Sequence, residues 1–164
     1  MPTPRVPAAD VKERARTLLV NMTERSRWIY ALPKSRCTQE DILAHVDLPE
    51  LDRAADGQVI KLGDERGHVV IFDQGTLDVI LLEGVGDGVV PMLAKILEHV
   101  PFVPQSKLWG EALAIGTPAA TPALRLLAYM AVGWDEDWSD LFLLHLASPA
   151  PVVRHDACLS RTLA

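Results

Sequence analysis

The chain has 164 residues, of which 49% are hydrophobic and 23% charged, so its composition is that of a globular protein rather than a disordered one. No stretch approaches the ~18 apolar residues of a membrane span, and two cysteines are too few for a disulfide framework. The first ten residues lack the apolar run of a secretory signal, so we expect a cytoplasmic protein with reduced thiols.

The net charge of −6 is distributed unevenly along the chain. Residues 1–36 hold eight Lys or Arg against three Asp or Glu, whereas residues 37–101 hold four against thirteen. One explanation is a basic first helix that packs beside an acidic body. The other is an acidic surface that attracts a basic protein by long-range steering and would repel a polyanion such as DNA.

The first predicted element is an amphipathic helix. Residues 1–9 carry three prolines and are expected to form a flexible arm, after which Asp10 and Glu13 have the spacing of a capping box. Apolar residues then recur at helical spacing, with charged residues on the opposite face. The apolar residues are Val11, Ala15, Leu18, Leu19 and Met22. We expect the helix to end before Pro33, because a proline disfavours helical backbone in the residue before it.

A short second helix and a small sheet are predicted next. Thr38 has the position of a helix cap, and the helix is expected to reach about His45. A further turn is expected within residues 49–57. Three runs rich in β-branched residues follow, at residues 59–62, 68–72 and 77–82. Turn clusters separate these runs, which indicates an antiparallel meander.

The rest of the chain has helical patterns. A helix at residues 89–100 leads to Pro104, which marks the best internal boundary, and four more helices are expected beyond it. The predicted fold is therefore α+β and mainly α, with N-terminal helices and a small antiparallel β-meander followed by a helical hairpin array. The predicted parts are the arm at 1–9, a helical and meander block at 10–104 and the array at 105–164, which can join the block as one compact domain.

The most informative pattern is a repeat at an offset of 29 residues in the C-terminal part. At this offset Arg125 aligns with Arg154 and Ala128 with Ala157. The other aligned pairs are Pro122 with Pro151, Leu124 with Val153 and Met130 with Leu159. A proline opens each helix, and the small alanines let a neighbouring helix approach closely. Each arginine can reach a carboxylate or carbonyl of an adjoining repeat.

Residues 148–157, SPAPVVRHDA, resemble the opening of a HEAT-like repeat, where a Val-Arg pair and a small residue begin a helix after a turn. The resemblance covers residues 106–164 and places Leu141, Leu144 and His145 on or near the inner face of the preceding helix. It implies binding of another macromolecule through a concave helix face. An open C-terminal end would be covered by the N-terminal block or by a second copy of the chain. Two ordinary helical hairpins with coincidental spacing are the alternative.

Residues 38–44 resemble the first helix of a winged helix-turn-helix, with the hairpin of residues 59–72 as its wing. The recognition helix would then lie within residues 47–56, which hold four acidic side chains and one arginine. A helix that enters the major groove presents Arg, Lys, Asn or Gln to the DNA. A DNA-binding regulator is therefore the second functional hypothesis, and these acidic residues argue against it.

No residue pattern points to a catalytic site, a cofactor or a metal. Residues 84–88 resemble the glycine loop of class I methyltransferases, but Leu82 stands where that family has an acidic residue. A turn into a helix explains these glycines. His145, His155 and Cys158 supply too few ligands for zinc. An enzyme with a pocket between the two blocks is the third hypothesis.

Two tryptophans lie in an acidic segment between predicted helices, and tryptophan is enriched in binding hot spots. Trp138 can alternatively turn inward while the acids stabilise the start of a helix. We expect a non-enzymatic protein-binding module, such as an adaptor or a neutralising partner of a basic protein. The candidate binding residues are Trp134, Asp135, Glu136, Asp137, Trp138, Arg125 and Arg154.

Overall fold

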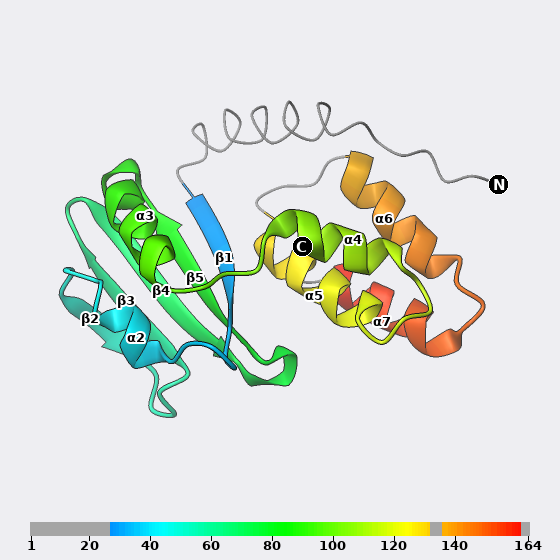
Figure 1. Cartoon of the computed structure of the whole chain (residues 1–164), viewed down its shortest axis with the longest axis horizontal. Coiled ribbons are helices and arrows are strands. Elements are labelled where there is room, and N and C mark those ends of the chain that lie inside the picture. Colours follow the sequence, from blue (N-terminus) through cyan, green and yellow to red (C-terminus); the bar gives the residue numbers. More distant parts are fainter. Residues whose placement is uncertain (1–26, 132–135, 162–164) are drawn as a thin grey trace.

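The computed structural model describes residues 27–131 and 136–161 and shows a five-stranded antiparallel sheet followed by a group of helices (Figure 1). The strands are β1 (Arg27–Pro33), β2 (Glu50–Arg53), β3 (Val59–Asp64), β4 (Gly67–Gln74) and β5 (Val79–Val85). Their order across the sheet is β1-β5-β4-β3-β2. Strands β2 to β5 thus form a meander, and β1 pairs with its last strand.

Two helices belong to the sheet part, α2 (Gln39–Leu43) between β1 and β2 and α3 (Val90–His99) after β5. The C-terminal part holds α4 (Gln105–Leu113), α5 (Ala120–Met130), α6 (Glu136–Leu146) and α7 (Pro151–Arg161). The short turns η1 (Gly75–Leu77) and η2 (Asp87–Val89) flank β5. Within the described ranges, none of the helices has the length and apolar character required to cross a membrane.

The expected fold class is wrong at its N-terminal side, because the described chain opens with a strand and the sheet precedes the helices. Strand β1 occupies residues that the pattern assigned to the end of the first helix. Its side chains are buried on both faces of the sheet, as Trp28, Ile29, Ala31 and Leu32 show. A strand buried on both faces lacks polar and apolar alternation, so periodicity does not distinguish it from a helix. Residues 1–26, which hold the predicted arm and most of that helix, lie outside the described residues.

The second correction concerns residues 47–56, which contain strand β2 in place of a helical turn. The recognition helix that the winged-helix resemblance requires is therefore not formed there. All four residues of β2 are exposed, and three of them are charged. Charged, exposed residues such as these have low β-propensity, and they form a strand because they pair with β3. The composition of the segment does not reveal that pairing.

The three predicted β-rich runs are confirmed as strands β3, β4 and β5 of an antiparallel meander. The predicted cap of the second helix is also confirmed. Thr38 accepts a hydrogen bond from the amide of Asp41, and the Thr38 amide donates to the Asp41 carboxylate at 2.8 Å. Local patterns thus identified the elements whose determinants lie close together in sequence.

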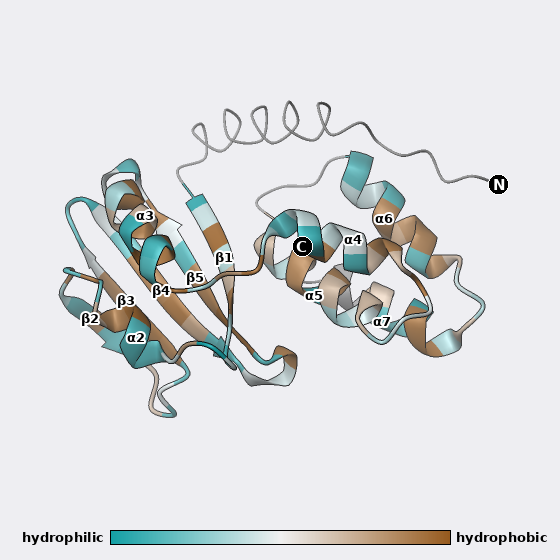
Figure 2. Cartoon of the chain, in the orientation of Figure 1, coloured by the Kyte–Doolittle hydropathy of each residue, from teal (hydrophilic) through white to brown (hydrophobic). Residues whose placement is uncertain are grey.

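The sheet separates two hydrophobic clusters. Helices α2 and α3 cover one face, where Gly84 lets α3 approach because an added Cβ would lie 2.5 Å from Leu93 Cδ1. On the other face, Ile29, Ala31 and Leu81 share a cluster with buried residues of α4 to α7. Figure 2 shows the apolar residues running along the inner strands and the facing helices. The boundary expected at residue 104 therefore divides elements that share one core.

Hydrogen bonds among the described residues join the C-terminal part to the sheet. The Val103 amide donates to the Ala31 carbonyl at 2.8 Å, so the connection after α3 follows the outer edge of β1. The Gln74 side-chain amide donates to the Tyr129 hydroxyl at 2.6 Å. The first bond keeps the chain that leads into α4 beside β1, and the second ties α5 to the end of β4.

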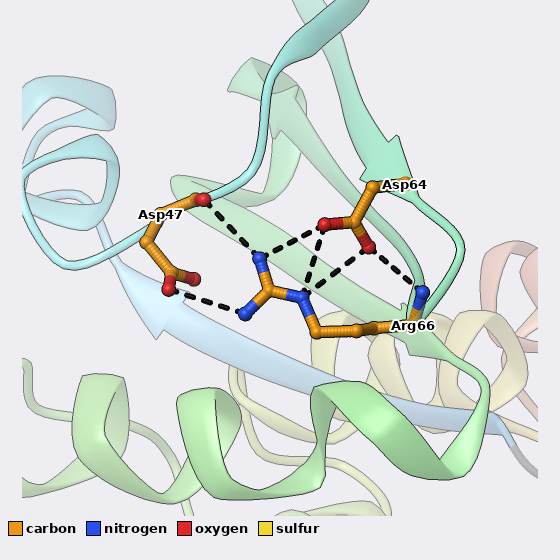
Figure 3. Close-up of polar contacts among 3 residues, drawn as sticks. All are labelled: Asp47, Asp64 and Arg66. Atoms are coloured by element: carbon orange, nitrogen blue, oxygen red, sulfur yellow. Dashed lines mark hydrogen bonds and ion pairs between the residues drawn. The ribbon is translucent and has the colours of Figure 1, made fainter.

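Arg66 joins the turn between β3 and β4 to the segment after α2 (Figure 3). Its guanidinium lies 2.9 Å from the Asp64 carboxylate and 3.2 Å from the Asp47 carboxylate. The hydrogen bonds that Arg66 donates lower the pKa of Asp64. All three residues are exposed, so the cluster fastens a surface turn.

Candidate protein-binding surface on helix α6

The four C-terminal helices pack as two neighbouring hairpins. Helix α5 contacts α4, α7 and β1, whereas α6 contacts α7 and α4. Ala128 of α5 and Ala157 of α7 are both buried, which agrees with a close approach of these two helices. The 29-residue offset therefore relates two helices that lie side by side.

The two repeat arginines act within this packing. Arg125 Nη2 lies 2.6 Å from Asp156 Oδ1, so the first hairpin is joined to a carboxylate of the second, as expected. Arg154 Nη1 donates to the carbonyls of Ser148 and Pro149 at 2.8 and 3.0 Å, which precede its own helix. Both arginines hold helices in place in this arrangement.

The acidic tryptophan segment is only partly described. Trp134 and Asp135 lie outside the described residues, whereas Glu136 and Asp137 are exposed in the first turn of α6. Trp138 is only 6% exposed, and its ring centroid lies 5.2 Å from that of Trp109. The inward alternative thus holds for Trp138, which packs α6 against α4.

His145 also faces α4. It is fully buried, and its Nε2 donates to the Ala112 carbonyl at 2.7 Å, which leaves Nδ1 without a partner among the described residues. His155 and Cys158, in contrast, are exposed on α7. The described residues contain no group of three or more side chains able to hold a metal ion.

The outer face of α6 carries an exposed apolar stripe. Leu143 is 60% and Leu144 49% exposed, and they line a shallow groove with Asp140 and Ala147. Spacings of three, four and seven residues place all four side chains on one side of the helix. We call these four residues the α6 stripe. Leu144 was expected near the inner face and is on the outer one, because residues 141–144 are apolar all round and give no phase.

Acidic side chains accompany the stripe. Asp140 belongs to it, and Glu136 lies one turn earlier along the same side of the helix. Val152, at the start of α7, is a further exposed apolar residue at 65%. The opposite side of α6 is fixed in the core by Trp138, Leu141, Phe142 and His145. The groove therefore lies on a helix whose orientation is set by packing.

A second hollow lies at α2 and the end of α3. His45 and His99 stack there with ring centroids 4.6 Å apart, beside Arg36, Cys37 and Asp41. Burial, followed by the nearby Asp41 carboxylate, raises the pKa of the Cys37 thiol. A raised pKa opposes thiolate formation, so this cysteine lacks the environment of a nucleophile. This hollow belongs to the sheet part and does not lie between the two parts of the chain.

The glycine loop also has a packing explanation. Gly84 is buried under Leu93, and a Cβ at Gly88 would lie 2.5 Å from the Arg66 carbonyl oxygen. The backbone at these positions is close to the chain's own atoms.

The chain matches no family model, no curated protein and no solved structure. What it binds must therefore be argued from its own surface.

Proposed function

We propose that this chain is a protein-binding module whose α6 stripe takes up a basic amphipathic helix of a protein partner. The observation that carries the proposal is the exposure of two adjacent leucines, Leu143 and Leu144, in a groove that begins at an aspartate. Positions i, i+3, i+4 and i+7 are those that one helix presents to another.

The energetics favour a helix with apolar anchors. Burying a fully exposed leucine side chain contributes about 1.5–3 kcal/mol. Leu143 and Leu144 are 60% and 49% exposed, so roughly half of that remains to be gained at each, which can support a weak complex. The core side of α6 is already held by Trp138 and His145, so little ordering is required of this surface on binding. A shallow apolar stripe on a helix that is packed in the core on its other side suits a helical ligand.

The acidic residues on α6 indicate that the partner helix is basic. Glu136 and Asp140 would meet lysines or arginines that flank the apolar anchors of the ligand helix. The HEAT-like resemblance supports the same class of function, because helical arrays of that type bind macromolecules. DNA binding has no comparable support, since strand β2 occupies the segment a recognition helix would need.

A synthetic peptide tests the proposal. The probe is a fluorescein-labelled helical peptide of leucine and lysine, with leucines at i, i+3, i+4 and i+7, and binding to the full chain is followed by anisotropy. We expect saturable binding that weakens about tenfold or more when Leu143→Ser and Leu144→Ser are combined, since hot-spot losses reach this size.

Leu113→Ser is the matched control, because Leu113 is 54% exposed at the end of α4 and outside the stripe. It should leave the affinity unchanged. A peptide with glutamate in place of lysine should bind much more weakly. Equal losses in the stripe and control variants, or equal binding of the two peptides, would contradict the proposal.

A further inference from the structure

We infer that the α6 stripe takes up residues 10–24 of a second copy of this chain, so that two chains form a dimer by exchanging these segments. The inference rests on the proposed function and names the partner for the same surface. Its occupant is a segment that precedes β1 and lies outside the described residues.

The two stripes have the same spacing. Val11, Ala15, Leu18, Leu19 and Met22 are separated by the same intervals as Glu136 followed by the four residues of the α6 stripe, Asp140, Leu143, Leu144 and Ala147. In a parallel pairing, Leu18 and Leu19 therefore lie against Leu143 and Leu144, and Met22 lies against the small Ala147. An isolated helix of about 15 residues is marginal in water, so such a segment gains its stability from a surface that covers the apolar stripe.

The charges agree with this register. It brings Lys12 next to Glu136 and Arg16 next to Asp140, so each basic residue meets an acidic residue of α6. Arg14 adds a third positive charge to the segment. The spacing of three, four and seven residues reads the same in either direction, so it is these charges that favour the parallel alignment, in which Val11 and Ala15 lie against Glu136 and Asp140.

The length of the connection assigns the segment to a second copy. Four residues separate Met22 from β1, and five Cα steps span at most about 18 Å. In the parallel register Met22 lies at the far end of α6. Helix α5 packs against β1, and α6 lies beyond it against α4 and α7 (Figure 1). The path from β1 to α5, then to α4 or α7, and then to α6 covers three packing distances of roughly 8–10 Å each. Their total exceeds the reach of about 18 Å.

Reciprocal exchange would close the assembly. Each chain offers one segment and one α6 stripe, so two copies related by a two-fold axis satisfy both surfaces. Leu143 and Leu144 of each chain are then covered, which removes an apolar patch from the surface. The same segment would compete with any other basic helix for the stripe.

A cross-linking experiment on the full chain tests the dimer. Equal amounts of chains with natural and heavy nitrogen isotopes are mixed, treated with a carbodiimide, and analysed by mass spectrometry together with sedimentation. We expect a dimer and mixed-isotope links between Lys12 and Glu136 or Asp140. Combining Leu18→Ser with Leu19→Ser, or Leu143→Ser with Leu144→Ser, should raise the dimer dissociation constant about tenfold or more.

Leu113→Ser should leave the dimer intact. Arg16→Glu should weaken it, and adding Asp140→Arg should restore it. A chain that is monomeric, or that forms these links only within one copy, overturns the inference. If such a monomer still binds the lysine-leucine peptide, only the dimer is refuted. If it does not bind the peptide, the proposed function is refuted as well.

Discussion

Side-chain exposure distinguishes residues that hold the fold from residues available to a partner. Trp138 and Leu143 lie five positions apart on α6, yet one is 6% and the other 60% exposed. The tryptophan draws attention in the sequence because its residue type is common in hot spots. In the structure Trp138 is buried in the core, where it contacts Trp109, whereas Leu143 is exposed to solvent.

Stability measurements separate these two residues. Trp138→Ala should lower the free energy of unfolding by about 3–5 kcal/mol, because it removes a large buried ring and leaves a cavity. Leu143→Ser should change it by no more than about 0.5 kcal/mol, as expected for a surface site. Urea unfolding followed by circular dichroism provides both values. A small loss for Trp138→Ala would show that α6 does not depend on this contact.

A pH titration tests the Arg66 cluster. Hydrogen bonds from Arg66 lower the pKa of Asp64, so the folded chain binds that proton less readily than the unfolded chain. The stabilisation is therefore present above the ordinary aspartate pKa and is lost as the pH falls through the lowered value. In Arg66→Gln, we expect the midpoint from carboxyl-carbon NMR shifts to rise toward the ordinary value.

Glu50 provides the internal control. Its pKa is lowered by a different residue, Arg53, whose guanidinium lies 2.8 Å away. Arg66→Gln should leave the Glu50 midpoint unchanged. An unaltered Asp64 midpoint in the variant would mean that Arg66 does not hold this carboxylate in solution.

At the scale of elements, predictability followed the distance in sequence between the interacting residues. The capping box of α2 joins residues three apart, and the meander strands are separated by visible turns, so both could be predicted. Strand β1 pairs with β5, more than 45 residues later, and is covered on both faces. Whether these residues form a strand depends on distant residues that pair with them and cover them, and a local sequence pattern does not identify those residues. The outer position of Leu144 could not be predicted either, because an apolar run has no phase.

The approach of α5 to α7 gives a further prediction. Ala128 and Ala157 are buried at the contact between these helices, and Arg125 pairs with Asp156 beside it. Ala128→Leu should overpack the contact and cost about 1–3 kcal/mol. Ala119→Leu, at the exposed start of α5, should cost little. Equal urea midpoints for the two variants would remove the close approach on which the repeat assignment depends.

For the whole molecule, the sheet orients a helical part whose outermost helix bears the candidate surface. Helix α5 is fixed to β1, and α6 is fixed in turn by α4 and α7, so the stripe is held at a distance from the sheet. The chain carries a net charge of −6, and most of its acidic residues lie between residues 37 and 101. The field of these charges extends over roughly 10 Å at 0.1 M salt. At 0.01 M salt it extends over about 30 Å, so a basic ligand is then attracted by the whole chain and is oriented at close range by the residues of α6.

The contrast between long-range attraction by the net charge and close-range orientation by α6 predicts how the association rate depends on salt. Asp140→Asn should slow the association of the lysine-leucine peptide about two- to threefold at low salt, because a charge beside the groove acts mainly on the encounter. The deficit should shrink toward 1 M sodium chloride, where the Debye length falls to about 3 Å. Glu98→Gln removes an equal charge from exposed Glu98 on α3, in the sheet part, and should slow association much less. Stopped-flow anisotropy at several salt concentrations measures these rates. Equal slowing by the two variants would show that only net charge attracts the ligand, and that Asp140 does not direct it to α6.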